Sequence, residues 1–196
     1  MDSQLAFITI CIASAASPGP GMLAVLSNSL NQNMQRTIPV ILGISTGLLL
    51  ASILSNSWLL TLVHTNALAY QVMTGLCSSY IIYLGCRALY YSRSQAMIEA
   101  RSYGYKSGVL ISLLNPKTIV FFGALFPLFV KSEQYFALQA ALLTLELVVI
   151  TLSIHLLLSL ATEKVARFLK RYVVTINRLT GLLFIALGLS GLLLQA

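Results

Sequence analysis

Long apolar segments alternate with short polar ones along the whole chain. Polar connectors at 31–33, 64–66 and 131–133 separate stretches that are rich in Leu, Ile, Val and Ala. A helix that spans a bilayer needs about 20 predominantly apolar residues, and each stretch reaches that length. The pattern therefore predicts an all-α integral membrane protein with six transmembrane helices, at about residues 5–30, 37–62, 67–90, 107–130, 136–161 and 173–194.

Proline interrupts two of these segments at matching depths. The first segment contains Ser17-Pro18-Gly19-Pro20-Gly21, and the fourth contains Asn115-Pro116-Lys117. Asn and Ser are favoured helix N-caps, and Pro fits the first helical position. Both Ser17-Pro18 and Asn115-Pro116 therefore predict a helix that stops and restarts near the membrane centre. The alternative is an ordinary proline kink in each span, with neighbouring helices satisfying the freed carbonyl groups.

Paired breaks of this kind predict a transport site. A restarted helix offers backbone N–H groups and a positive dipole end, which suit a carboxylate, and interruptions in corresponding halves point to the binding site of a transporter. The candidate substrate-binding residues are Ser17, Pro18, Gly19, Pro20, Asn115, Pro116 and Lys117.

The two halves of the chain are expected to run in opposite directions through the membrane. Residues about 1–91 and about 104–196 form two inverted three-helix repeats, joined by a cytosolic connector at about 92–103, within a single transmembrane domain spanning 1–196. All but two of the 12 basic residues lie in the first, third and fifth connections. Since Lys and Arg concentrate in cytoplasmic loops, we expect both termini on the outer face.

Two charged residues are expected deep in the membrane. Lys117 follows the second break, and Glu146 lies well inside the fifth span. A charge at the bilayer centre costs at least about 2.5–3.5 kcal/mol, which either a mutual ion pair or a functional role would explain. Glu146 is the candidate proton-coupling residue. His155, nine residues further on, falls on the opposite face of the helix and is expected to be a packing residue.

Composition excludes several other classes of protein. The chain is 58% hydrophobic and 9% charged, whereas soluble domains carry about 25% charged residues. Its net charge of +7 is spread over connectors without a contiguous basic and aromatic patch, so no nucleic-acid partner is expected. We find no nucleophile–base motif and no zinc-type Cys/His spacing, which predicts no enzyme activity, no cofactor and no metal.

Several motifs together resemble those of the lysine exporter (LysE/RhtB-type) family of bacterial amino-acid exporters. They extend over nearly the whole chain, at 17–20, 43–47, 80–89, 114–122 with Phe126-Pro127, and 177–181 with Gly188. The resemblance implies a compact six-helix fold in the bacterial inner membrane and export of amino acids or related small metabolites, driven by protons. Two positions differ from the usual family pattern: Gly21, where Asn is common, and Leu48, where a polar or acidic residue is common.

The expected partners follow from this interpretation. They are a small-molecule substrate and membrane lipids, and a homo-oligomer is left open. The alternative function is a non-transporting accessory or signalling component on the same scaffold, whose basic third and fifth connections bind a cytosolic protein or anionic lipid.

Overall fold

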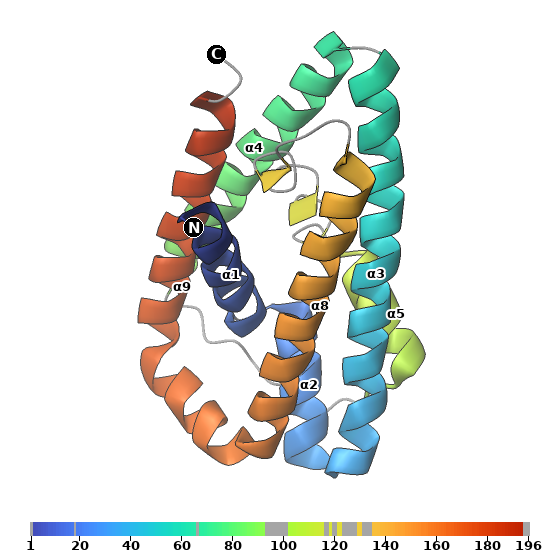
Figure 1. The fold of residues 1–196 in the computed structure, drawn as a ribbon. Coiled ribbons are helices and arrows are strands. Elements are labelled where there is room, and N and C mark those ends of the chain that lie inside the picture. The colour runs from blue at the N-terminus through green and yellow to red at the C-terminus, as the bar shows by residue number, and fades with distance from the viewer. Residues whose placement is uncertain are drawn as a thin grey trace.

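The computed structural model describes residues 2–17, 19–65, 67–92, 102–115, 118, 121–122, 129–130 and 135–193. Its regular elements in these ranges are helices (Figure 1): α1 (Asp2–Ala16), α2 (Pro20–Asn31), α3 (Met34–Thr65), α4 (Ala67–Tyr90), α5 (Tyr105–Leu113), α8 (Phe136–Leu160) and α9 (Thr162–Leu193). The predicted all-α class is therefore correct for the described part of the chain.

The long helices lie side by side and alternate in direction. The α2–α3 and α8–α9 junctions lie at one end of the molecule, and the α3–α4 junction lies at the other (Figure 1). Within the described residues, three segments are long and apolar enough to cross a membrane: Met34–Ser57, Phe136–Leu160 and Arg171–Leu193. A fourth is added if Gln4–Ala16 and Pro20–Asn31, which bend by 51°, are counted as one span.

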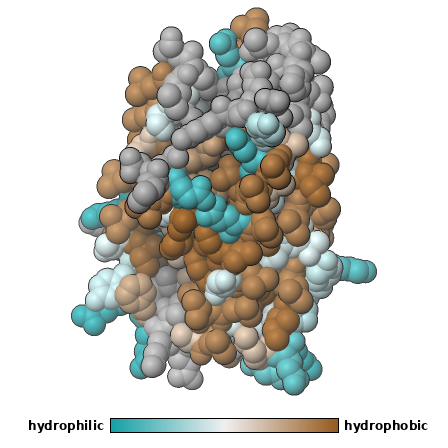
Figure 2. Space-filling view, in the orientation of Figure 1, coloured by the Kyte–Doolittle hydropathy of each residue, from teal (hydrophilic) through white to brown (hydrophobic). Residues whose placement is uncertain are grey.

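Helix α8 has polar residues inside and apolar residues outside. Leu145 is 57% exposed and Leu157 is 65% exposed, whereas His155 is 3% exposed and Thr151 is 6% exposed. Hydrophobic residues also form a broad area across the middle of the face in Figure 2. A helix in water would turn these leucines inward, whereas spanning helices direct their rare polar residues towards the bundle interior. The arrangement is that of a membrane-spanning helix.

Glycine contacts bring α5 close to α3. A Cβ atom at Gly43 would overlap the carbonyl group of Tyr105, and one at Gly47 would lie 2.7 Å from the carbonyl oxygen of Val109. Small residues permit this kind of backbone approach in membrane helices. Gly85 and Gly188 likewise allow the backbones of α4 and α9 to approach closely. The close packing of α5 on α3 therefore determines where the C-terminal end of α5 lies in space.

One predicted boundary differs from the structure. The segment 163–171, expected to be a charged connector before the sixth span, belongs to α9, which runs unbroken from Thr162 to Leu193. Lys and Arg are good helix formers, so the change in hydropathy near residue 171 marks the limit of the apolar window without ending the helix. In the fourth predicted span, α5 accounts for Tyr105–Leu113, and most of the rest lies outside the described residues.

Candidate functional site

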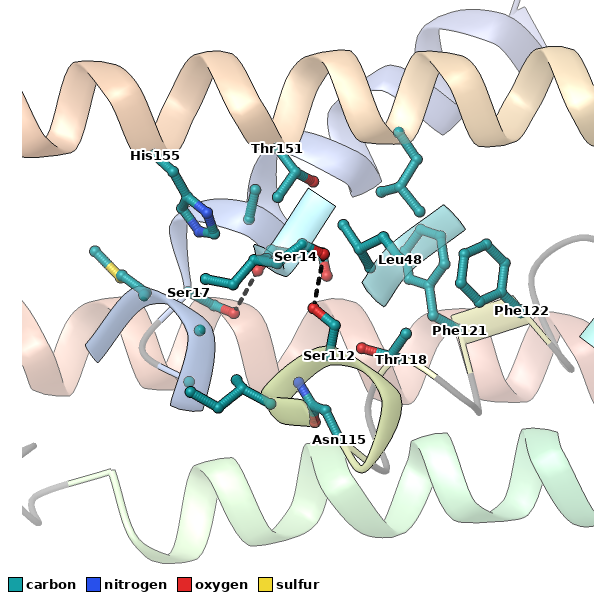
Figure 3. A pocket seen from close by; sticks show the side chains of 17 residues that line it. Ser14, Ser17, Leu48, Ser112, Asn115, Thr118, Phe121, Phe122, Thr151 and His155 are labelled. Carbon is teal, nitrogen blue, oxygen red and sulfur yellow. Dashed lines mark hydrogen bonds between the residues drawn. The ribbon is translucent and has the colours of Figure 1, made fainter. Parts of the chain in front are cut away.

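A cavity with a mixed polar and apolar lining lies among α1, α2, α3, α5 and α8 (Figure 3). Its volume is about 70 Å³. Its described polar lining consists of hydroxyl, amide and imidazole side chains: Ser14, Ser17, Ser112, Asn115, Thr118, Thr151 and His155. The apolar lining includes Leu48, Phe121 and Phe122.

One wall of the cavity comes from the gap between α1 and α2. Ser17 is 5% exposed, and its Oγ donates a hydrogen bond of 2.9 Å to the carbonyl oxygen of Ser14, at the end of α1. Gly19 is the N-cap of α2, with extended backbone (φ −149°, ψ 174°), and Pro20 stands at the first helical position. The predicted cap at Ser17 is therefore wrong by two residues, because α2 begins at Pro20 and its N-cap is Gly19.

The opposite wall comes from the end of α5. Leu114 closes the helix through its N–H, which donates to the carbonyl oxygen of Leu110. Asn115 follows and is half-buried in the cavity wall, and its carbonyl oxygen accepts a 2.9 Å hydrogen bond from the N–H of Thr118. Ser112 Oγ donates to the carbonyl oxygen of Ile44 in α3 at 2.9 Å. The α3–α5 packing thus positions this wall.

Residues from the two predicted breaks meet in this cavity. Ser17 and Gly19 line it together with Asn115, which is distant in sequence. Pro20 is exposed and begins α2 without lining the cavity. Pro18, Pro116 and Lys117 lie outside the described residues, so the structure gives no position for them.

Helix α8 supplies two cavity residues that the sequence analysis did not place in the site: Thr151 was given no role, and His155 was expected to be a packing residue. Thr151 and His155 both line the cavity and are buried. The sequence does contain a pattern that points to them. Thr144, Thr151 and His155 are spaced by seven and four residues and therefore lie on one face of the helix. Hydropathy alone did not single out these residues, because polar side chains are few in α8.

Glu146 lies on a different face of α8, as its spacing from His155 predicted. It is absent from the described cavity lining, and its Oε2 accepts a 2.8 Å hydrogen bond from Nε2 of Gln4 in α1. The expected pair with Lys117 falls outside the described residues. The proton-coupling role of Glu146 remains a prediction.

Aromatic side chains close the end of the cavity remote from His155. Phe121 and Phe122 lie at that end in Figure 3. Their ring centroids are 6.0 Å apart, and Phe7 of α1 packs on Phe121 at 6.5 Å and on Phe129 at 5.1 Å. Such ring contacts stabilise an apolar cluster, so the described lining at this end offers no hydrogen-bonding side chain next to the two rings.

The described lining contains no Asp, Glu, Lys or Arg. It offers hydrogen-bonding groups from side chains, together with the first N–H groups of α2 at Gly21 and Met22. The first N–H groups of a helix have no acceptor within the helix and favour an anionic group. The arrangement suits a small polar solute that carries a carboxylate or carbonyl oxygen. Within the described residues, no group of His, Cys, Asp and Glu is arranged to hold a metal ion.

Comparison with known proteins gives relatives along nearly the full length. A homoserine/homoserine lactone efflux protein of Salmonella typhimurium is 25% identical over 190 residues, which cover 93% of this chain and 92% of that protein. Its counterpart from Salmonella typhi has the same identity and coverage. An uncharacterized membrane protein of Vibrio cholerae is 25% identical over 195 residues, or 94% of each chain.

No solved structure matches the chain. The model of the LysE type translocators matches residues 12–195, a range that includes all the described cavity residues. This match agrees with the motifs at both breaks and with the apolar helices. The chain therefore belongs to the LysE type translocator family.

Proposed function

We propose that this chain is a secondary active exporter that moves small amino acids with uncharged side chains, or metabolites related to them, out of the cytoplasm in exchange for protons. The observation that carries the proposal is the meeting of Ser17, Gly19 and Asn115 in one cavity whose lining includes hydroxyl, amide and imidazole side chains. Interrupted helices that meet near the midplane are typical of transporter binding sites. The printed names of the Salmonella relatives, homoserine/homoserine lactone efflux proteins, support an exported solute of this size.

The proposed architecture is six spans in two inverted repeats, with α1–α2 and α5 as the interrupted members. Its support is the pattern of helix packing. The third and sixth proposed spans, α4 and α9, pack together, and so do the second and fifth, α3 and α8. The packing of α5 on α3 has its counterpart in the packing of α1 on α8. These pairings are the ones that a pseudo-two-fold axis between the halves would generate.

Substrate recognition follows from the chemistry of the lining. A carboxylate would lie at the start of α2, within reach of the N–H groups of Gly21 and Met22. Ser112, Asn115 and Thr151 would hydrogen-bond the amino and hydroxyl groups. A cationic side chain would find no carboxylate in the described lining, and an unpaired buried charge is costly, so lysine-like solutes are excluded. Pro18, Pro116 and Lys117 remain proposed site residues.

The proposed orientation places the α2–α3 and α8–α9 junctions in the cytosol and both termini on the outer face of the bacterial inner membrane. The basic residues Arg36, Arg167 and Arg171 occur close to these junctions, and Lys and Arg mark cytoplasmic ends. The aromatic cluster of Phe7, Phe121, Phe122 and Phe129 then seals the outer end of the cavity.

The test is counterflow in proteoliposomes that contain only this chain. Vesicles preloaded with unlabelled homoserine are expected to take up labelled homoserine, whereas vesicles preloaded with lysine are not. Asn115→Ala is expected to lower the homoserine rate by about tenfold, the effect of one lost hydrogen bond in a buried site. Ser79→Ala is the control, because Ser79 is exposed on α4 and its Oγ donates to its own helix, at Gly75, at 2.8 Å. Absence of counterflow for a panel of small amino acids would favour the accessory-component alternative.

A further inference from the structure

His155 is the titratable side chain in the described lining of the cavity. We propose that His155 carries the coupled proton, and that a row of hydroxyl and amide side chains between α3 and α8 delivers this proton from the outer side. The row, here called the α3–α8 seam, consists of Ser45, Ser52, Asn56, Thr144 and Thr151. The inference rests on the proposed export function and names the residue that couples it to protons.

Within the described residues, no Asp, Glu, Lys or Arg lines the cavity that contains His155. A Cβ atom at Gly21 would lie 3.8 Å from Cε1 of His155, so the imidazole lies against the first turn of α2, where the substrate carboxylate is proposed to bind. From the other packed elements the described lining contributes Ser17 and Ile44. Glu146 lies on the far face of the same helix, and Lys117 is outside the described residues. Imidazole is the side chain that gains and loses a proton near neutral pH.

The α3–α8 seam contains a buried hydrogen bond between Ser52 of α3 and Thr144 of α8. Thr144 Oγ1 also donates to the carbonyl oxygen of Ala140 at 2.6 Å, and Asn56 Nδ2 donates to Ser52 Oγ at 2.9 Å. These contacts link polar groups over successive turns of two helices. They lie on the side of the cavity that faces the predicted outer end of α3.

Helix geometry extends this seam to the cavity. Helices α3 and α8 run antiparallel (Figure 1), so the contact of Ser52 with Thr144 places Ser45 level with Thr151, two turns further in. Ser45, Ser52 and Asn56 lie on one face of α3 by their spacing. Thr151 and His155 are one turn apart on α8 and both line the cavity. The polar groups therefore follow one side of the α3–α8 contact from Asn56 to His155, with a rise of about 10 Å between the Ser52–Thr144 pair and the level of Ser45 and Thr151.

Two members of the seam have unused hydrogen-bonding capacity. Ser45 Oγ and Asn56 Oδ1 are buried and have no hydrogen-bond partner in the part of the chain that the structure describes. Buried polar atoms normally have a partner, and ordered water is the usual one where protein groups are absent. Water at these positions would join the hydroxyl groups into a path for protons. If the α3–α8 seam only held the two helices together, Ser45 Oγ and Asn56 Oδ1 would be expected to have partners within the protein.

The proton step is balanced without any further reactant. When the site faces outward and the solute has left, a proton from the outer water reaches the neutral imidazole through the seam, and a new N–H bond forms. When the site faces inward, that N–H bond breaks and the proton passes to the cytosolic water before the next solute binds. One proton therefore moves inward for each solute that moves outward.

The experiment compares two modes of transport in proteoliposomes, with homoserine as the probe and the membrane potential held at zero. Counterflow requires no net proton movement. Accumulation driven by a lumen one pH unit more acidic than the bath does require it, and it reaches up to about tenfold for one-to-one exchange. His155→Gln keeps a hydrogen-bonding side chain but cannot titrate. It is expected to lose gradient-driven accumulation entirely, while counterflow falls by less than about tenfold.

Seam variants give a second readout that does not depend on His155. Ser45→Ala and Ser52→Ala are expected to slow proton release, followed by a pH-sensitive dye in the lumen, more than they slow counterflow. Ser57→Ala is the control, because Ser57 lies on the exposed side of the same helix and its Oγ donates to the carbonyl oxygen of Ile53 at 2.8 Å. Equal slowing of both modes in the seam variants would refute the proton path.

The outcomes separate this inference from the export function on which it rests. Normal accumulation in His155→Gln would overturn the inference, and so would equal loss of counterflow and accumulation, which would make His155 a binding or packing residue. If Glu146→Gln lost gradient-driven accumulation while His155→Gln kept it, Glu146 rather than His155 would carry the coupled proton. If the wild-type protein shows counterflow but no accumulation in response to the pH gradient, the inference is overturned and the export function stands. Absence of wild-type counterflow for small amino acids overturns both.

Discussion

Replacing Asn28 with alanine is expected to destabilise the protein more than any other single polar substitution near the proposed cytosolic end. Asn28 is 0% exposed and lies on α2. Its Nδ2 donates to the carbonyl oxygens of Arg36 at 3.0 Å and Tyr103 at 2.6 Å. Its Oδ1 accepts from the N–H of Tyr103 at 2.8 Å. One side chain thus joins α2 to the start of α3 and to the segment that precedes α5.

The magnitude follows from the groups that Asn28→Ala leaves behind. A buried donor or acceptor without a partner costs about 1–3 kcal/mol, and this substitution removes the partner of one N–H group and affects two carbonyl oxygens. We expect a total loss of about 3 kcal/mol, because each carbonyl oxygen retains a second lone pair. For a chain of this size that loss lowers Tm by roughly 6–12 °C.

The assay is thermal unfolding of the purified protein in detergent, followed by loss of the monodisperse peak on size-exclusion chromatography. Asn28→Asp separates the bonds, since it keeps the acceptor for the N–H of Tyr103 and loses both donations. Asn31→Ala is the control, because Asn31 is exposed on the same helix and its Nδ2 donates only to Ser27 at 2.8 Å. If Asn28→Ala melted within 2 °C of Asn31→Ala, a range below the shift expected from about 1 kcal/mol, the hydrogen bonds of Asn28 to Arg36 and Tyr103 would contribute little to stability, contrary to this prediction.

Three further predictions concern packing, the site and orientation. Gly43→Ala is expected to push α5 away from α3, because the new methyl group meets the Tyr105 carbonyl, and thereby to abolish counterflow; Gly104→Ala, where nothing lies within 4 Å, should transport normally. Lys117→Ala is expected to abolish efflux while the protein still inserts, so wild-type export with that variant, at equal membrane abundance on an immunoblot, would exclude Lys117 from the site. A reporter enzyme that is active only outside the cytoplasm, fused after Ala196, is expected to be active; activity instead after a fusion within the α8–α9 junction would reverse the proposed orientation.

Hydropathy was sufficient to predict the helical membrane class, and the proline-rich segment at 17–21 coincides with the gap between α1 and α2. Each is a local property: burial of apolar surface in lipid is additive along a segment, and proline limits its own backbone wherever it stands. The detail of the break was not predictable in the same way. Gly19 is the cap of α2, whereas Ser17 belongs to the end of α1, where its Oγ donates to the carbonyl oxygen of Ser14.

The sequence by itself determined which residues are apolar enough to span a bilayer, and on which face of α8 Glu146 and His155 fall. Only the tertiary structure decided which of those faces lines a cavity. That choice depends on how closely helices approach, which is set where Gly43 and Gly47 admit the backbone of α5 and where Ser52 meets Thr144. Such contacts join residues far apart in the chain, and the free energy of a contact depends on both partners, so one segment read alone cannot specify it.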